Sequence, residues 1–89
     1  MNLYNIDYTH MATLHCTIAN VSETLFDGAV DSVTVPGTSG EMTIMAHHAP
    51  LISPLKDGTI TVKIGGDKKT YTITGGVLEI SENHASILV

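Results

Sequence analysis

Two adjacent histidines and a nearby carboxylate are the residues of this chain best suited to chemistry. His47 and His48 follow Glu41 within the stretch from Val35 to Leu51. Imidazole and carboxylate groups are common ligands of transition metals, and His84 could complete such a set. Because adjacent residues on a strand point to opposite faces, His47 and His48 cannot easily share one metal ion. We therefore predict no metal site.

A metal-dependent enzyme stays open as an alternative function. A small β-barrel enzyme of the cupin type would use His47 or His48 together with Glu41 and His84. The His-x-His spacing of such sites is absent from the sequence. A carbohydrate-binding sandwich is a weaker alternative. Such modules need exposed aromatic residues, and the chain has one phenylalanine, three tyrosines and no tryptophan.

The single cysteine is expected to be structural. Cys16 alternates with Leu14 and Ile18, so the three side chains share one face of a strand and are predicted to be buried. His15 points to the opposite face, away from the thiol that it would have to activate. The glycine-rich pieces match neither a phosphate-binding loop nor a dinucleotide-binding fingerprint. We expect no catalytic residue and no cofactor.

Composition argues against two classes of partner. The chain has 89 residues, enough for one small domain, and a net charge of -5. Its four basic residues are all lysines, so no nucleic-acid partner is expected. No apolar run approaches the roughly 20 residues of a membrane span, so no direct membrane insertion is expected.

The first ten residues differ from the rest of the chain. Residues 1–10 show little periodicity, and the His10-Met11 junction is one that a common cloning site encodes. We expect residues 1–10 to be an expression leader or a disordered extension. Residues 11–89 are expected to form the folded domain.

Apolar and polar residues alternate along most of the chain, and no segment has sustained helical periodicity. The alternation is strict in residues 59–64 and repeats in residues 70–74. Turn signals separate the runs, among them Asp27-Gly28 and Gly65-Gly66-Asp67, of which the second predicts a hairpin loop. Gly75-Gly76 is expected to permit a bulge or a close backbone approach. The further strands are expected over residues 13–19, 30–35, 77–81 and 84–89. This pattern indicates an all-β antiparallel sandwich or barrel.

Apolar side chains in the stretch from Val35 to Leu51 have two possible roles. Methionines at irregular positions either fill a core or pack against a partner protein. Taken alone, the residues favour the core. The side chains concerned are Met42, Ile44, Met45, Ala49, Pro50 and Leu51.

Several short motifs follow one another in a fixed order over residues 13–89. They are the strand Leu14–Ile18, Leu25-Phe26-Asp27-Gly28-Ala29-Val30, Pro36-Gly37-Thr38-Ser39-Gly40-Glu41-Met42-Thr43-Ile44, His48-Ala49-Pro50-Leu51, Lys56-Asp57-Gly58, and Gly75-Gly76-Val77-Leu78-Glu79-Ile80 with Asn83–Leu88. In this order they resemble the N-terminal β-sandwich domain of the F-type ATP synthase ε subunit, the equivalent of mitochondrial δ.

This resemblance implies both a fold and a role. The fold is a ten-stranded, two-sheet antiparallel β-sandwich, or flattened barrel. The role is that of a non-catalytic rotor subunit of the central stalk. Such a subunit docks on the γ subunit and on the polar loops of the c-ring, and it couples ion-driven rotation to ATP synthesis. It is peripheral on the cytoplasmic face of the bacterial plasma membrane.

The resemblance also implies contact residues. The family's ring-facing loop corresponds to Ser39, Gly40, Glu41 and Met42, and its contact near γ corresponds to His48, Ala49 and Pro50, with Met45 as a further contact residue. Many family members continue into a C-terminal helical hairpin. The sequence stops at Val89, so we expect hairpin-based inhibition and hairpin ATP binding to be absent from this chain.

Overall fold

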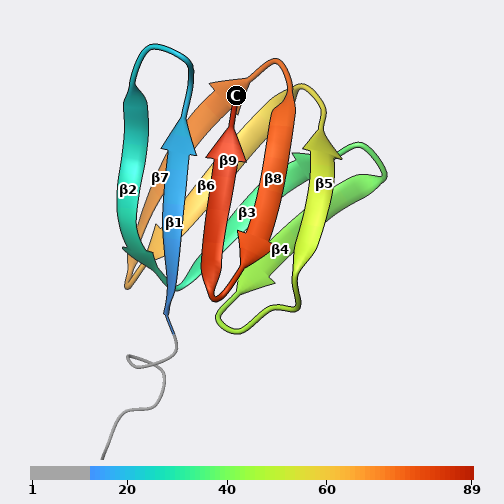
Figure 1. The fold of residues 1–89 in the computed structure, drawn as a ribbon. Helices are drawn as coiled ribbons and strands as arrows, with labels where there is room; N and C mark the ends of the chain where they lie inside the picture. The colour runs from blue at the N-terminus through green and yellow to red at the C-terminus, as the bar shows by residue number, and fades with distance from the viewer. Residues whose placement is uncertain (1–12) are drawn as a thin grey trace, which may run out of the picture.

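Nine β-strands make up residues 13–89, the part of the chain that a computed structural model describes (Figure 1). The proposed leader, residues 1–10, lies outside the described residues. The strands are β1 (Leu14–Ala19), β2 (Thr24–Val30), β3 (Ser32–Gly37), β4 (Gly40–Met45), β5 (Leu51–Leu55), β6 (Gly58–Ile64), β7 (Asp67–Ile73), β8 (Gly76–Ser81) and β9 (His84–Leu88).

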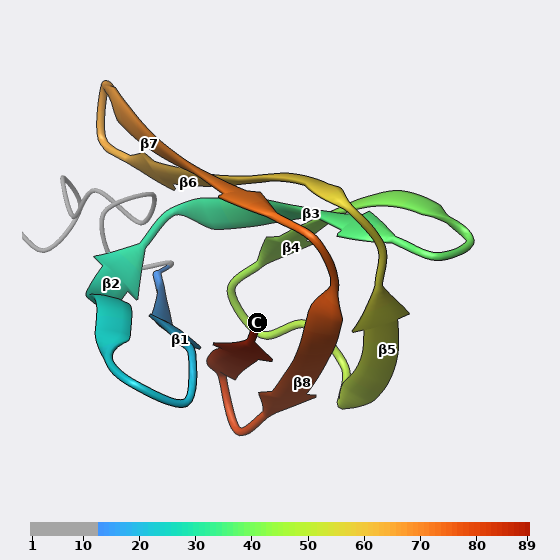
Figure 2. The same cartoon turned by 90° about the horizontal axis from the view of Figure 1, so that it is seen from above.

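These strands form two layers of one curled sheet (Figures 1 and 2). The front layer of Figure 1 has the order β2-β1-β9-β8-β5, and the rear layer has the order β4-β3-β6-β7. The layers join at one corner, where Gly37 of β3 pairs with Leu55 of β5. The sheet curls through this corner. Residues 13–89 form nine strands, whereas the resemblance implied ten.

One strand pair departs from the expected antiparallel arrangement. β1 and β9 run parallel, from His15 opposite His84 to Ala19 opposite Leu88. A parallel pair cannot be closed by a tight turn and needs a long connection, which here is the rest of the domain. The first and last strands are thus neighbours inside the front layer (Figure 1).

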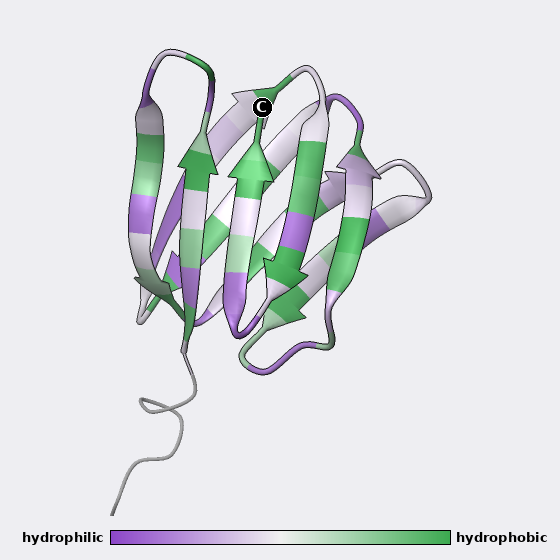
Figure 3. Ribbon diagram, viewed as in Figure 1, coloured by the Kyte–Doolittle hydropathy of each residue, from purple (hydrophilic) through white to green (hydrophobic). Residues whose placement is uncertain are grey.

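The core lies between the layers and is built from the alternating apolar residues. Leu14, Cys16 and Ile18 of β1 point into it and are almost fully buried, as the alternation predicted. Apolar bands alternate with polar ones along the strands (Figure 3). Burial raises the pKa of the Cys16 thiol to about 12, with a smaller contribution from the charge of Asp27, so the thiol stays protonated and inert. The other buried apolar side chains are Val30, Val33, Val35, Ile44, Leu55, Ile60, Val62, Ile73, Leu78, Ile80, Ala85 and Ile87.

Side chains close the open side of the curl, where β2 faces the hairpin of β6 and β7. Phe26 of β2 packs edge to face against Tyr71 of β7, with ring centroids 6.4 Å apart. The ammonium group of Lys69 lies 5.6 Å from the Phe26 ring centroid, within range of a cation–π contact. Asp27-Gly28, which resembles a turn in the sequence, lies inside β2. The two layers are therefore held together by backbone pairing on one side and by an aromatic contact on the other.

Two short turns shape the β6–β7 and β8–β9 hairpins. Gly65 adopts φ 59° in the loop between β6 and β7, which confirms the hairpin predicted there. Glu82 (φ 50°) and Asn83 (φ 60°) form the turn between β8 and β9, although neither is a glycine. A Cβ atom on Gly76 would lie 2.4 Å from the carbonyl oxygen of Leu88, so Gly76 makes the predicted close backbone approach.

Candidate functional site

The first group of expected contact residues lies at the tip of the β3–β4 hairpin. Ser39 is in the turn, and Gly40 and Glu41 begin β4; all three are exposed. Met42 is half-buried and packs against the core, so only part of its side chain is available to a partner. The backbone N–H of Thr38 donates a 3.2 Å hydrogen bond to the carbonyl of Pro54, which ties the hairpin to β5.

The second group lies at the other end of β4. Met45 ends the strand with an exposed side chain, and His48, Ala49 and Pro50 follow in the exposed loop that leads to β5. The N–H of His48 donates to the carbonyl of Met45 (3.3 Å), and the His48 ring nitrogen Nδ1 lies 2.7 Å from the carbonyl oxygen of Ala49. These local bonds shape the loop without engaging the core.

Asn83 anchors this loop to the front layer. Its side-chain oxygen accepts a 2.8 Å hydrogen bond from the backbone N–H of His47, and its side-chain nitrogen donates to the carbonyl of Thr13 (2.9 Å). Its own carbonyl accepts from the N–H of His15 (3.1 Å). One side chain thus connects three segments, and it holds His47 at φ 62°.

β4 separates the two groups, so they do not form one continuous loop. A strand rises about 3.3 Å per residue, and the hairpin tip and the β4–β5 loop therefore lie roughly 17 Å apart. The sequence pattern from Val35 to Leu51 indicates a short apolar strand between the turn signals and the histidine pair, and β4 is that strand. Each group can face a different partner.

The structure does not assemble the metal-ligand set of the cupin alternative. His47 and His48 lie in a turn and not on a strand, so strand geometry does not apply to them. His84 is on β9, where its ring packs against that of His15 with centroids 4.7 Å apart. Within residues 13–89, no three histidine, cysteine, aspartate or glutamate side chains converge in a way that could hold a metal ion.

An apolar surface that the sequence did not predict lies on the outer face of the front layer. Ile52 is 69% exposed, Leu88 is 54% exposed and Val77 is 42% exposed. Val77 pairs with both Leu88 and the exposed Pro54, which places the side chains on one face. We call Ile52, Pro54, Val77 and Leu88 the outer strip. The sequence feature that could have revealed the outer strip is an apolar residue at a position where the alternation expects a polar, outward one. Val77 and Leu88 are such residues, beside the inward Leu78 and Ile87.

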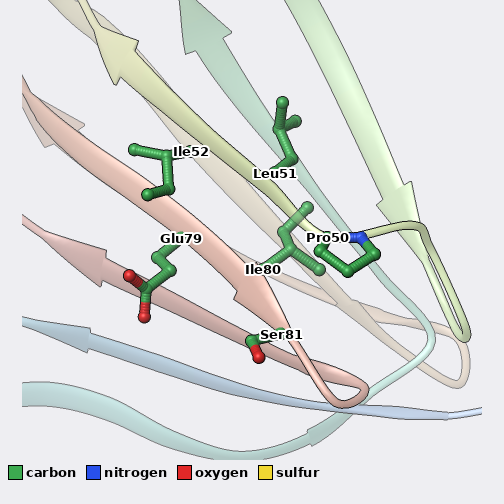
Figure 4. Close-up of a pocket in the computed structure, with 6 residues that line it drawn as sticks. All are labelled: Pro50, Leu51, Ile52, Glu79, Ile80 and Ser81. Carbon is green, nitrogen blue, oxygen red and sulfur yellow. The ribbon is translucent and has the colours of Figure 1, made fainter.

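A shallow open hollow continues the outer strip toward the β4–β5 loop. Figure 4 shows the hollow between β5 and β8, with Pro50 at one end and Ile52 and Glu79 farther along. Its lining residues are Pro50, Leu51, Ile52, Glu79, Ile80 and Ser81. The strip, the hollow and the loop form one surface.

A polar cluster lies beside this surface, on β1, β2 and β9. Asp27 bonds to the ring of His15 and accepts a 3.0 Å hydrogen bond from the Thr17 hydroxyl. The same hydroxyl lies 2.9 Å from Nε2 of His84. The hydrogen bonds from His15 and Thr17 lower the pKa of Asp27. The cluster holds a carboxylate, two imidazoles and the Thr17 hydroxyl, which gives its one hydrogen to Asp27.

Comparison with known proteins decides the family. The sequence profile of the family described as "ATP synthase, Delta/Epsilon chain, beta-sandwich domain" matches residues 13–89. The chain belongs to this family. Among curated relatives, the ATP synthase epsilon chain of Bradyrhizobium sp. (strain ORS 278) is 40% identical over 78 residues. That of Rhodopseudomonas palustris (strain BisA53) is 36% identical over 78 residues. Each match covers 88% of this chain and 58% of the relative, so the chain spans little more than half the length of these epsilon chains.

Solved structures agree with the delta/epsilon assignment. A chain in the Euglena gracilis mitochondrial ATP synthase, a structure of OSCP, F1 and c-ring, superposes with a TM-score of 0.83 at 26% identity. This match covers 88% of this chain and 51% of that one. A chain in the Tetrahymena thermophila mitochondrial ATP synthase central stalk and c-ring has the same fold, with a TM-score of 0.70 at 17% identity, over 84% of this chain and 61% of that one. Within residues 13–89, no helix is long and apolar enough to span a bilayer.

Proposed function

We propose that this delta/epsilon-type domain is a non-catalytic rotor subunit of the central stalk of a bacterial F1Fo ATP synthase. It docks on the γ subunit and on the polar loops of the c-ring, and so couples ion-driven rotation to ATP synthesis. In this role it is peripheral on the cytoplasmic face of the plasma membrane. Family membership favours this role over a cupin-like enzyme.

The observation that carries the proposal is the outer strip together with the β4–β5 loop. Exposed apolar side chains gathered on one face, as in the outer strip, are costly to keep in water, and such patches mark protein interfaces. Pro50 of the loop lines the hollow together with Ile52 of the outer strip, so the loop adjoins the strip there (Figure 4). We assign this surface to γ.

The hairpin tip, roughly 17 Å away along β4, is assigned to the c-ring. Ser39 and Gly40 are small and exposed, and Glu41 presents a carboxylate to the polar loops of the ring. Exposed charges of this kind mainly set the register and the rate of association. A domain that meets two partners at opposite ends of one strand can transmit torque between them, because the strand is held rigidly by its pairing with β3.

The experiment is to mix the chain with the purified γ subunit of the same synthase at micromolar concentration and to measure co-elution on a sizing column. Ile52→Glu places a charge in the outer strip and is expected to weaken binding at least about tenfold, since it buries an unpaired carboxylate. The matched control is Val21→Glu, which changes a 96% exposed apolar residue in the turn between β1 and β2. If the wild-type chain does not co-elute with γ, the proposal is wrong.

A further inference from the structure

The two layers end in four strands, β2 and β5 in the front layer and β4 and β7 in the rear layer. β5 carries Pro54 and is joined to β3 at Leu55, and of the other three edges only that of β4 lacks protection. Unpaired edges invite further strands, and proteins guard them with lysines, bulges or covering side chains. β7 carries Asp67, Lys68 and Lys69, and β2 has a register shift against β1. The β2 and β7 edges also meet each other at the Phe26–Tyr71 contact. β4 has neither lysine nor proline nor bulge, and Glu41 is its one charged residue.

Hydrogen-bond phase shows which β4 groups face away from the sheet. The two-residue turn at Thr38-Ser39 makes Gly37 and Gly40 a hydrogen-bonded pair, after which bonded and non-bonded pairs alternate. Met42 and Ile44 therefore bond to β3, while the backbone groups of Glu41, Thr43 and Met45 point outward. Pro36 confirms this phase, because it lies opposite Glu41 and has no N–H to give.

The outward groups are available to a partner. Within residues 13–89, one outward backbone group of β4 is already used by a turn or loop: the carbonyl of Met45 accepts a hydrogen bond from the N–H of His48. The side chains of Glu41, Thr43 and Met45 are exposed. The edge thus offers three N–H groups and two free carbonyls in the spacing of a strand.

We infer that an extended segment of the γ partner adds to this edge as a further strand of the rear layer, an inference that rests on the proposed function. Strand addition takes its affinity from backbone bonds and its specificity from alternate side chains. The segment lies next to Met45, where the edge meets the β4–β5 loop, so the added strand is continuous with the surface assigned to γ. An acidic residue opposite Glu41 would be repelled, so the segment is neutral or basic at that position.

A second copy of this chain fits the edge less well. Two copies paired antiparallel about Thr43 would place the carboxylate of Glu41 against Met45 of the other copy. One strand edge also buries far less than the roughly 1,000 Å² that a stable interface needs. Both copies would carry the same net charge of -5. A strand that belongs to a larger contact with γ avoids all three costs.

Amide hydrogen exchange, resolved by residue in the isotope-labelled chain with and without γ, tests the strand addition. The amides of Glu41, Thr43 and Met45 are expected to exchange at least about tenfold more slowly in the complex, because each gains a hydrogen-bonded acceptor. If the complex forms and these amides exchange as in the free chain, the strand addition is wrong while the proposed function stands. If no complex with γ forms, both the strand addition and the proposed function are wrong.

A matched pair of proline variants gives an independent readout. Thr43→Pro removes the central outward N–H of β4 and is expected to weaken γ binding at least about tenfold. Thr70→Pro is the control, because the same phase argument gives Thr70 an outward N–H on the β7 edge. Equal affinity of the two variants for γ overturns the inference. If Thr43→Pro does not fold, exchange in the wild-type complex still decides.

Discussion

At the scale of single residues, polar side chains hold the β4–β5 loop in place. Asn83 alone connects the β8–β9 turn, the start of β1 and the β4–β5 loop. Asparagine tolerates a left-handed backbone better than most residues, and here it also supplies a donor and an acceptor. The hydrogen bond that Asn83 accepts from His47, a residue 36 positions away, has no local signature in the sequence.

Asp27 is expected to make the stability of the fold depend on pH. Its pKa in the folded chain is lowered from the ordinary value of 3.8 by hydrogen bonds from His15 and Thr17. A depressed pKa stabilises the fold above the unfolded pKa, and this contribution is lost as pH falls through the folded pKa. The free energy of unfolding of the wild type is therefore expected to fall more steeply below about pH 4 than that of Asp27→Asn.

Urea titrations between about pH 5 and about pH 2 measure this difference. Asp57→Asn serves as the control, because no side-chain hydrogen bond to Asp57 is present within residues 13–89. Parallel pH profiles for the wild type and Asp27→Asn would show that the polar cluster does not hold the carboxylate in solution.

At the scale of elements, alternation predicted most strands because one face of each is buried. Leu14, Cys16 and Ile18 show the rule, and the hairpin at Gly65 follows from glycine chemistry. The alternation did not predict β2, because Asp27-Gly28 is typical of a turn. In the fold, Gly28 lies inside the strand, next to the Phe26 ring. The outer strip depends on the pairing of β5, β8 and β9, which brings distant segments together, and periodicity does not encode this pairing.

Gly76 supplies a prediction for the β8 element. Gly76→Ala places a methyl group 2.4 Å from the carbonyl of Leu88, a backbone atom that cannot move aside easily. The expected cost is at least about 2 kcal/mol of unfolding free energy. Gly66→Ala, in the β6–β7 loop, meets no atom within 4 Å and is expected to change the stability by less than about 0.5 kcal/mol. Urea unfolding compares the two, and equal costs would contradict the close approach.

At the scale of the whole molecule, the two layers are closed differently on their two sides. Gly37 and Leu55 join them through the backbone, whereas Phe26, Tyr71 and Lys69 join them through side chains. Under the proposed function, torque passed from one layer to the other would depend on both closures. The aromatic side has no ladder of hydrogen bonds and is therefore the side that opens first.

Phe26→Ala tests this closure. Loss of the half-buried ring, its aromatic contact and its cation–π contact is expected to cost about 2 kcal/mol of unfolding free energy. Hydrogen exchange should rise in β2 and β7 and stay unchanged in β8 and β9. Val21→Ala, at a nearly fully exposed site, controls for loss of apolar surface and should have little effect. A uniform rise in exchange over all strands would argue against a local seam.

The parallel pairing of β1 with β9 dictates when this protein can become native during its synthesis. β1 is the first of these nine strands to leave the ribosome, and its neighbour β9 is the last of the nine, with His15 opposite His84. Until β9 emerges, β1 and β2 lack the strand that joins them to β8, so the front layer is incomplete and their apolar face cannot be buried in it. The nascent domain, residues 13–89, must therefore stay unfolded, or be shielded, until nearly all of it has been made.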